Sequence, residues 1–254
     1  MISSFDILMA ESMLYHAANL SFCYEFDSRM ILKCLDSLDS IYKSQLPAGA
    51  SSWANSPVLG VGSNLYRVIF KICQLCHRTP LQPEDQIFAE NLAEELRAAE
   101  DFEKYASSPE TDDAIKSHCF KSSRLYAIAV RTILYKIQHP KLQAEHAWIQ
   151  SQVREGIDIL RSLPAPYNSS QYLCWPIFII GCGLIRDSDI IFVRQTLKDM
   201  WESFFCGENA RAVLVLEASW KTTQQMRRDT GSIVQCRSIY GLDLLLHKAY
   251  KQSL

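Results

Sequence analysis

The sequence lacks the clustered positive charge that proteins use to bind nucleic acids. Its formal net charge is −2, and its densest basic stretch, residues 221–228, has three cationic side chains among eight. A protein that binds duplex DNA neutralises phosphates with many Lys and Arg side chains gathered on one face. We therefore expect no direct nucleic-acid binding by this chain.

Long apolar runs are also missing. The longest one, residues 173–185, is interrupted by Pro176, Gly181 and Gly183, whereas a helix that crosses a membrane needs about 20 apolar residues. The first residues place Asp6 where a secretory signal would carry basic side chains. We expect no association with a membrane, and a location in the nucleus or the cytoplasm.

The nine cysteines do not form a recognisable metal-binding pattern. One C-x-x-C pair, Cys73 and Cys76, lacks the second pair that a structural zinc site requires. Both positions fall in a helical pattern, which predicts two buried thiols one turn apart. Most of the other cysteines have apolar neighbours, where a free thiol behaves as a small hydrophobic group. The pattern predicts a reducing compartment and no bound metal.

Motifs of enzyme catalysis are equally scarce. Asp112 and Asp113 lack the third acid, one turn later, that would complete an aspartate-rich metal site. The six histidines are scattered, without the i, i+4 spacing of a metal-binding helix. Residues 60–63 precede a helix but follow no strand and include no lysine, so a turn with a helix cap is favoured over a phosphate loop. No cofactor is expected.

What the sequence does contain is helical periodicity along most of its length. Ser28, Ser63 and Asn209 are candidate N-caps, and Pro83 followed by two acids is typical of a helix start. We expect helices over residues 4–20, from 28, from 63 to 79, over 83–106, up to 138, over 140–163, across 175–176, from 187 or 188, from 209, and through 239–248. The predicted fold is all-α, a single domain spanning 1–254 and built as an irregular bundle of about nine or ten helices.

Two of these helices have patterns that predict their burial. The helix over 83–106 is expected to bury Phe88, Leu92 and Leu96 and to expose its many charged residues. The helix that ends at Gln138 has apolar residues on most sides of its second half, which predicts a central position.

Residues 172–183 form an apolar segment with unusual backbone residues. Pro176 has no N–H group, so it kinks or starts a helix and frees the carbonyl that this N–H would have bonded. Gly181 and Gly183 either let another backbone approach closely or leave a cavity beside the helix.

Trp175, Phe178 and Cys182 project to one side of this segment, because they are three and four residues apart. They form either the wall of a ligand pocket or ordinary core packing against the central helix. The candidate ligand-binding residues lie on or beside the most buried helices: Trp175, Phe178, Cys182, Tyr126, Tyr172 and His118.

A second group of large residues follows Asn209. Leu216 and Trp220 are four residues apart and therefore share one helix face. Glu217 lies beside them, and it is expected either to cap a neighbouring helix or to form an ion pair with one of two cations, Arg186 and Arg211. A structural role is favoured for Asn209, Leu216, Glu217 and Trp220.

The segments 172–183 and 209–220 resemble the closing signature of the fungal-specific transcription factor domain. In that family the domain is the regulatory region C-terminal to a DNA-binding cluster of two zinc ions and six cysteines. The resemblance is best over 57–220, and it includes Pro57-Val-Leu-Gly60, residues 64–69 and the helix around Leu125. It implies a regulatory domain, here without the zinc cluster, of a kind thought to bind small apolar effectors or to mask activation surfaces.

Two classes of function are compatible with these features. The first is a ligand-sensing or protein-interaction domain of a transcription regulator, in which a small apolar effector stabilises one helix packing over another. The second is a metal-independent cyclase or isomerase of a fungal secondary-metabolite pathway that uses the same apolar pocket. Its candidate polar residues are Tyr126, Arg131, Tyr135, His118 and Tyr172. A third alternative is a homodimeric scaffold without a ligand.

Overall fold

The computed structural model describes residues 4–25, 28–45, 63–99, 113–163, 171–204, 207–228 and 241–246. Every regular element within these ranges is a helix, which confirms the all-α prediction. The α-helices are α1 (Ser4–Cys23), α2 (Ser28–Gln45), α3 (Ser63–Leu75), α4 (Pro83–Ala99), α5 (Asp113–Gln138), α6 (Ala147–Ser162), α7 (Cys174–Cys182), α8 (Asp187–Phe204) and α9 (Gly207–Arg228). Three 3₁₀-helices accompany them: η2 (Cys76–Arg78), η5 (Gln171–Leu173) and η6 (Gly241–Leu245).

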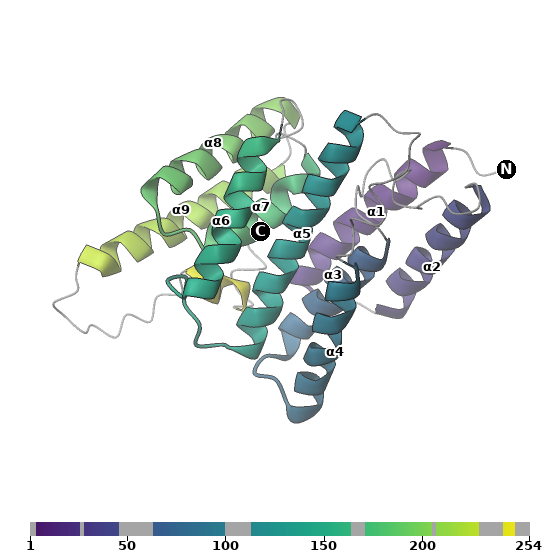
Figure 1. The fold of residues 1–254 in the computed structure, drawn as a ribbon, viewed down its shortest axis with the longest axis horizontal. Helices are drawn as coiled ribbons and strands as arrows, with labels where there is room; N and C mark the ends of the chain where they lie inside the picture. Colours follow the sequence, from purple (N-terminus) through teal and green to yellow (C-terminus); the bar gives the residue numbers. More distant parts are fainter. Residues whose placement is uncertain are drawn as a thin grey trace.

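Helix α5 runs through the middle of the molecule, as its sequence predicts. It contacts α3 and α4 on one side and α6 and α7 on the other. Figure 1 shows α1 to α4 on one side of α5 and α6 to α9 on the opposite side. Residues 125–130 are buried without interruption, because neighbouring helices cover α5 around its whole circumference.

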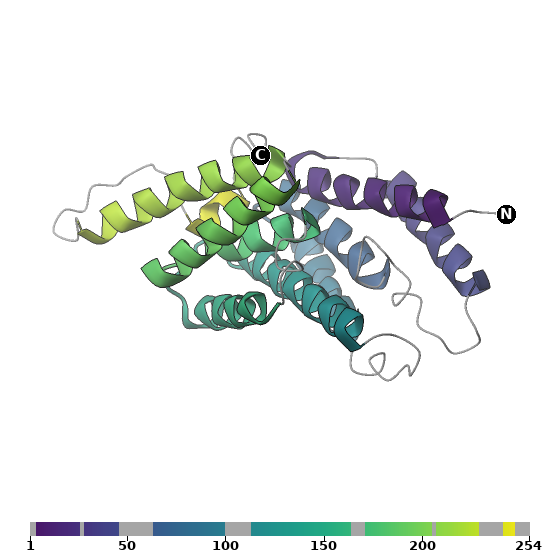
Figure 2. The ribbon, with the colours of Figure 1, turned by 90° about the horizontal axis from the view of Figure 1, so that it is seen from above.

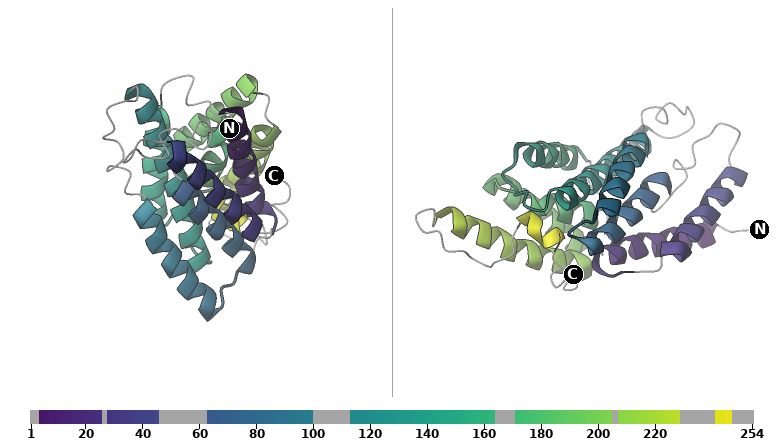
Figure 3. Two further views of the ribbon diagram at one scale, coloured as in Figure 1. Left: turned by 90° about the vertical axis from the view of Figure 1, so that its right-hand side faces the viewer. Right: turned by 90° about the horizontal axis from the view of Figure 1, so that it is seen from below.

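Helix α7 is the other central element. All nine of its residues, Cys174–Cys182, are buried. A helix that is apolar on every side can be stable only inside the molecule, and α7 packs against α5, α6, α8 and α9. Figure 2 and Figure 3 show α6 on one side of α7, with α9 and α1 along the other side of the molecule.

The prediction that a helix begins at Pro140 is wrong. Residues 139–146 form turns, and α6 begins at Ala147, where the Nδ1 atom of His146 accepts a hydrogen bond of 3.3 Å from the backbone N–H of Trp148. The physical reason lies in α5. The ammonium group of Lys136 donates hydrogen bonds of 2.6 Å to the carbonyls of Pro140 and Leu142, which holds these residues in a loop.

The predicted burial of Phe88 is also wrong. Helix α4 buries Ala89, Leu92 and Leu96, whereas the Phe88 side chain is 38% exposed. Because adjacent helix positions are about 100° apart, Phe88 lies beside the buried stripe and faces outward. The predicted continuation of this helix over 100–106 lies outside the described residues.

The ends of the chain differ in part from the expected helices. The first helix extends three residues further than predicted, to Cys23. In the predicted C-terminal helix, the described residues 241–246 form the short 3₁₀-helix η6 and a turn, and 239–240 and 247–248 are outside the described ranges. The motif Pro57-Val-Leu-Gly60 is outside them as well.

The C-x-x-C pair has the predicted environment. Cys73 of α3 and Cys76 of η2 are both buried thiols. None of the described helices is both long and apolar enough to cross a lipid bilayer.

Candidate functional site

Six aromatic side chains meet in the core where α1, α3, α5 and α7 converge. We call this group the aromatic cluster, and its members are Tyr15, Phe22, Tyr66, Tyr126, Tyr172 and Trp175. The rings of Tyr126 and Trp175 are stacked, with centroids 5.8 Å apart and an angle of 19° between their planes. Tyr15 meets Tyr172 edge to face at 5.0 Å. The cluster therefore joins four α-helices and the short element η5.

Pro176 positions the hydroxyl of Tyr126. In a continuous α-helix the N–H of residue 176 would bond the carbonyl of Tyr172, but proline has no N–H to donate. The Tyr126 hydroxyl donates a hydrogen bond to this carbonyl instead. The Tyr66 hydroxyl lies 3.5 Å from that of Tyr126. The freed carbonyl predicted from the sequence is thus bonded by a side chain of the central helix.

The hydroxyl groups of Tyr66 and Tyr126 stay protonated at neutral pH. Burial raises the pKa of Tyr66 and of Tyr126 well above the ordinary value of 10.0, and nearby acidic groups add to the increase. One of these groups is the carboxyl of Glu11, which is completely buried in α1. The core thus contains polar hydrogen-bonding groups among its aromatic rings.

Three of the six candidate ligand-binding residues belong to the aromatic cluster: Trp175, Tyr126 and Tyr172. Phe178 and Cys182 are buried further along α7, and burial raises the pKa of the Cys182 thiol. His118 lies about two turns before Tyr126 on α5, where burial and the charge of Lys121 lower its pKa.

The polar residues considered for an enzyme are divided between separate places. Tyr126 and Tyr172 are together, as described. Tyr135 lies further along α5, with its ring centroid 4.1 Å from that of Trp148. Arg131 is 3.9 Å from the carboxylate of Glu155 on α6.

Gly181 of α7 and Gly183, directly after α7, allow close packing of side chains. A Cβ atom on Gly181 would lie 2.8 Å from Cδ1 of Leu216, and one on Gly183 would lie 2.7 Å from Cγ2 of Val153. Neighbouring side chains therefore fill the space beside both glycines. The indole N–H of Trp220 donates a hydrogen bond of 2.9 Å to the carbonyl of Gly181, which fixes α9 against α7.

Two predictions for α9 are wrong. Asn209 is not an N-cap, because the helix begins at Gly207 and Asn209 lies within its first turn. Its side chain is completely buried and turns inward. Glu217 pairs with Arg194 of α8, not with Arg186 or Arg211. Leu216 and Trp220 share the buried face, as predicted.

Among the buried side chains of α7 and α9, two polar groups have no hydrogen-bonding partner in the part of the chain that the structure describes. They are the whole amide of Asn209, both Oδ1 and Nδ2, and the indole N–H of Trp175. An unpaired buried polar group is unfavourable by about 1–3 kcal/mol. The sequence could not show this, because Asn209 next to a helix start is normally exposed and acts as a cap.

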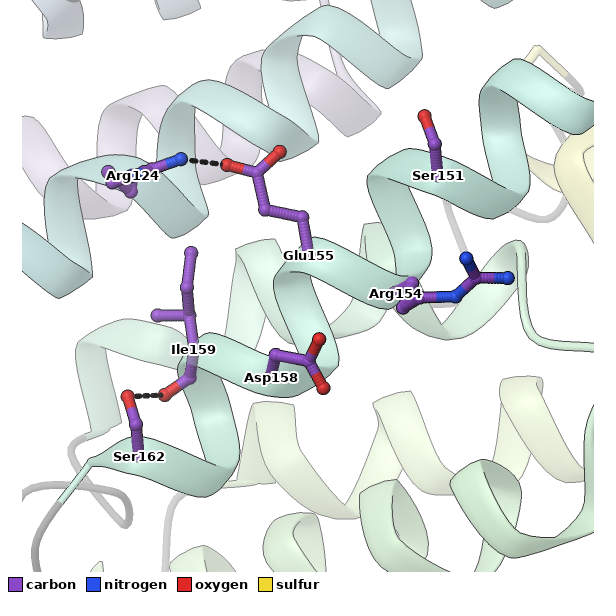
Figure 4. A pocket seen from close by; sticks show the side chains of 7 residues that line it. All are labelled: Arg124, Ser151, Arg154, Glu155, Asp158, Ile159 and Ser162. Carbon is purple, nitrogen blue, oxygen red and sulfur yellow. Dashed lines mark hydrogen bonds and ion pairs between the residues drawn. The ribbon is translucent and has the colours of Figure 1, made fainter.

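A surface depression of about 500 Å³ lies on the other side of α5, against α6. Seven residues line it: Arg124, Ser151, Arg154, Glu155, Asp158, Ile159 and Ser162. Figure 4 shows Arg124 of α5 joined to Glu155 of α6 across it. None of the candidate residues from the sequence lies here, and the charges of both signs on its walls indicate a solvated helix junction.

An ion pair between a buried lysine and a partly exposed aspartate joins the end of α5 to η6. The Lys136 side chain is completely buried, and its ammonium group lies 2.6 Å from the carboxylate of Asp243 in η6. Gln143 donates a second hydrogen bond to the same carboxylate. The signal in the sequence was a lone Lys among the apolar residues at the end of α5, but its partner is more than 100 residues away.

Comparison with known proteins identifies a family for this chain. The profile of the fungal-specific transcription factor domain matches residues 20–246, which is most of the chain. No curated protein and no solved structure shows significant similarity. The matched region runs from the end of α1 to η6 and includes α3, α5, α7 and α9, so it contains most of the aromatic cluster and the whole α7–α9 junction. The chain therefore belongs to the fungal-specific transcription factor domain family.

Proposed function

We propose that this chain is a ligand-responsive regulatory domain that controls transcription through another, DNA-binding polypeptide. Membership of the family supports a transcription-regulator role, for which a location in the nucleus or the cytoplasm is suitable. The observation that carries the ligand-responsive part is the aromatic cluster, since it combines large apolar rings with buried hydroxyl groups at the junction of α1, α3, α5 and α7.

The position of the cluster explains how a ligand could change the domain. A compound that inserts among rings from four helices changes the relative stability of alternative helix packings by its difference in affinity for them. Helix α7 transmits such a change, because it contacts both α5 and the α8–α9 pair. The output is a surface that binds a partner protein or a second copy of the chain.

The test uses the full chain fused to an unrelated DNA-binding module in a fungal reporter strain. We expect the fusion to change reporter output relative to the module alone, and we expect Trp175→Phe to reduce that change by weakening the stack on Tyr126. The matched control is Trp148→Phe, since Trp148 packs on Tyr135, outside the aromatic cluster. Equal output from the fusion and the module alone would contradict the proposal.

A further inference from the structure

The first turn of α9 meets α1 directly beside the aromatic cluster. The Nδ1 atom of His16 on α1 lies 3.5 Å from the carboxylate of Glu208, the residue before Asn209. Tyr15, the residue before His16, is buried and touches Tyr172. Both side chains of the His16–Glu208 contact are partly exposed. This contact therefore lies at the surface, above Tyr15 and Asn209; Figure 2 shows α1 and α9 along the same side of the molecule.

Asn209 belongs to the face of α9 that packs inward. It precedes Ala212, Leu216 and Trp220 at helical spacing, and all four residues are buried. The end of this face is held against Gly181 of α7 by Leu216 and Trp220. The charge of Glu208 also contributes to raising the pKa of Tyr126, after burial itself, Tyr15 and Cys174. These relations place the first turn of α9, with Asn209 on its buried face, near the α1 side of the cluster.

The chemistry of the unpaired groups defines what could bind there. The amide of Asn209 offers a donor and an acceptor side by side, and Trp175 offers a further donor. A side-chain amide pairs well with another group that presents an adjacent donor and acceptor. The surrounding rings favour a flat molecule. A net charge is excluded by the cost of removing it from water.

We propose that Asn209 and the aromatic cluster form a binding site for a small, uncharged, planar molecule that carries a cyclic amide or an equivalent donor–acceptor edge. The site lies beneath the His16–Glu208 contact. The inference rests on the proposed function, for which it names the class of effector. It assigns to Asn209 a recognition role instead of the structural one expected from the sequence.

The binding test uses 2-quinolone, a flat bicyclic cyclic amide, as the probe. Its N-methyl derivative is the matched control, because it keeps the ring and the carbonyl but loses the N–H donor. We expect the purified full chain to bind 2-quinolone about tenfold more tightly than the N-methyl compound, as one buried hydrogen bond provides. Titration followed by calorimetry measures both affinities. Equal affinities, or no binding of either probe, overturn the proposal.

Two variants separate recognition from folding. Asn209→Leu removes both polar atoms and keeps the branched arrangement of side-chain heavy atoms, so we expect it to lose the preference for 2-quinolone. Without any ligand it should melt about 2–4 °C higher than the unmodified chain, because an unpaired buried amide is replaced by an apolar group. An unchanged or lower melting temperature would show that the Asn209 amide stabilises the fold through hydrogen bonds of its own, for example to a buried water. That result would overturn the proposal.

The control variant is Thr223→Val on the same helix. The Thr223 hydroxyl is buried but already donates a hydrogen bond of 3.0 Å to the carbonyl of Ser219. We expect it to keep the preference for 2-quinolone. The reporter experiment with Trp175→Phe does not use 2-quinolone, so the two proposals can fail separately. If the fusion regulates the reporter but 2-quinolone does not bind, the proposed amide site is wrong and the proposed regulatory function still stands.

Discussion

At the scale of single residues, the core of this protein is stabilised by polar groups as well as by apolar contacts. Tyr126 illustrates this, because its ring stacks on Trp175 while its hydroxyl donates a hydrogen bond to the carbonyl of Tyr172, to which Pro176 has no N–H to donate. One side chain thus compensates for the irregular start of α7. The buried amide of Asn209 is the opposite case, since neither of its polar atoms is satisfied by the described residues.

We expect Tyr126→Phe to lower the free energy of unfolding by about 1–3 kcal/mol, because the carbonyl of Tyr172 then loses its donor. Urea denaturation measures the change. Tyr135→Phe is the matched control, as the Tyr135 hydroxyl makes no hydrogen bond with the described residues and its loss should change stability by less than about 0.5 kcal/mol. Similar losses in both variants would contradict the assigned role of the Tyr126 hydroxyl.

Stability should also fall in alkaline solution. The pKa of Tyr66 is raised well above 10.0 in the folded state by burial, so above about pH 10 the unfolded chain loses this proton first. The contribution of the protonated Tyr66 hydroxyl to the free energy of unfolding is fully present below pH 10. It is lost as the pH rises toward the folded-state pKa, at up to about 1.4 kcal/mol per pH unit. Urea denaturation at a series of pH values should show a smaller loss for Tyr66→Phe than for the unmodified chain; an identical loss would contradict the prediction.

At the scale of elements, the contact between α7 and α9 depends on the absence of a side chain at Gly181. Leu216 occupies the space where a Cβ atom would be, and Trp220 bonds the Gly181 carbonyl. Because Leu216 is completely buried, it cannot move aside without disturbing other packed groups.

We therefore expect Gly181→Ala to lower the free energy of unfolding by about 1–3 kcal/mol through overpacking. Adding Leu216→Ala should lower the free energy of unfolding less in the Gly181→Ala variant than in the unmodified chain, since the added Cβ atom and the Leu216 side chain occupy the same space. Gly207→Ala is the control, because nothing lies within 4 Å of its Cβ position. It should be neutral or stabilising by up to about 1 kcal/mol. Equal losses at Gly181 and Gly207 in thermal or urea denaturation would refute the packing argument.

At the scale of the whole molecule, distant parts of the chain are joined through the central helices. One continuous hydrophobic core includes residues of every α-helix from α1 to α9 and of η6. Lys136 adds polar contacts between distant parts of the chain. It joins the end of α5 to the loop before α6 and to Asp243 near the C-terminus.

We expect Lys136→Met to lower the free energy of unfolding by about 3 kcal/mol, the lower end of the range for a broken buried ion pair, because Asp243 is partly exposed. Lys198→Met is the control, since its pair with Glu202 is well exposed on both sides. Its removal should change stability by less than about 1 kcal/mol. Denaturation followed by circular dichroism measures both, and a small effect at Lys136 would show that the pair does not stabilise the closed bundle.

The boundaries of several helices could be predicted because they depend on local chemistry. Ser28, Ser63 and Pro83 begin helices where expected, since caps and proline act on the adjacent turn. The prediction of a helix start at Pro140 was wrong because the side chain of Lys136 bonds the carbonyls that a helix would use. The predicted burial of Phe88 was wrong because several faces of α4 carry apolar residues, and only packing against a neighbouring helix determines which face is buried.

The candidate site shows the same division between local and long-range information. The sequence placed Trp175, Tyr126 and Tyr172 on buried segments, but it could not show that Tyr15, Phe22 and Tyr66 would meet them, because these residues are distant along the chain. It assigned Asn209 to a cap, which is the usual role of this residue type near a helix start. Only the position of α9 turned this amide inward.

The amino-acid sequence alone determined the all-α class, the family, and the burial of the segment around Trp175 and Pro176, since periodicity, caps and apolar runs act over a few residues. The tertiary structure decided which rings form the aromatic cluster, which arginine Glu217 binds, and where Lys136 and Asn209 place their polar groups. These outcomes depend on contacts between residues far apart in the chain, and only the packed helices bring such residues within bonding distance.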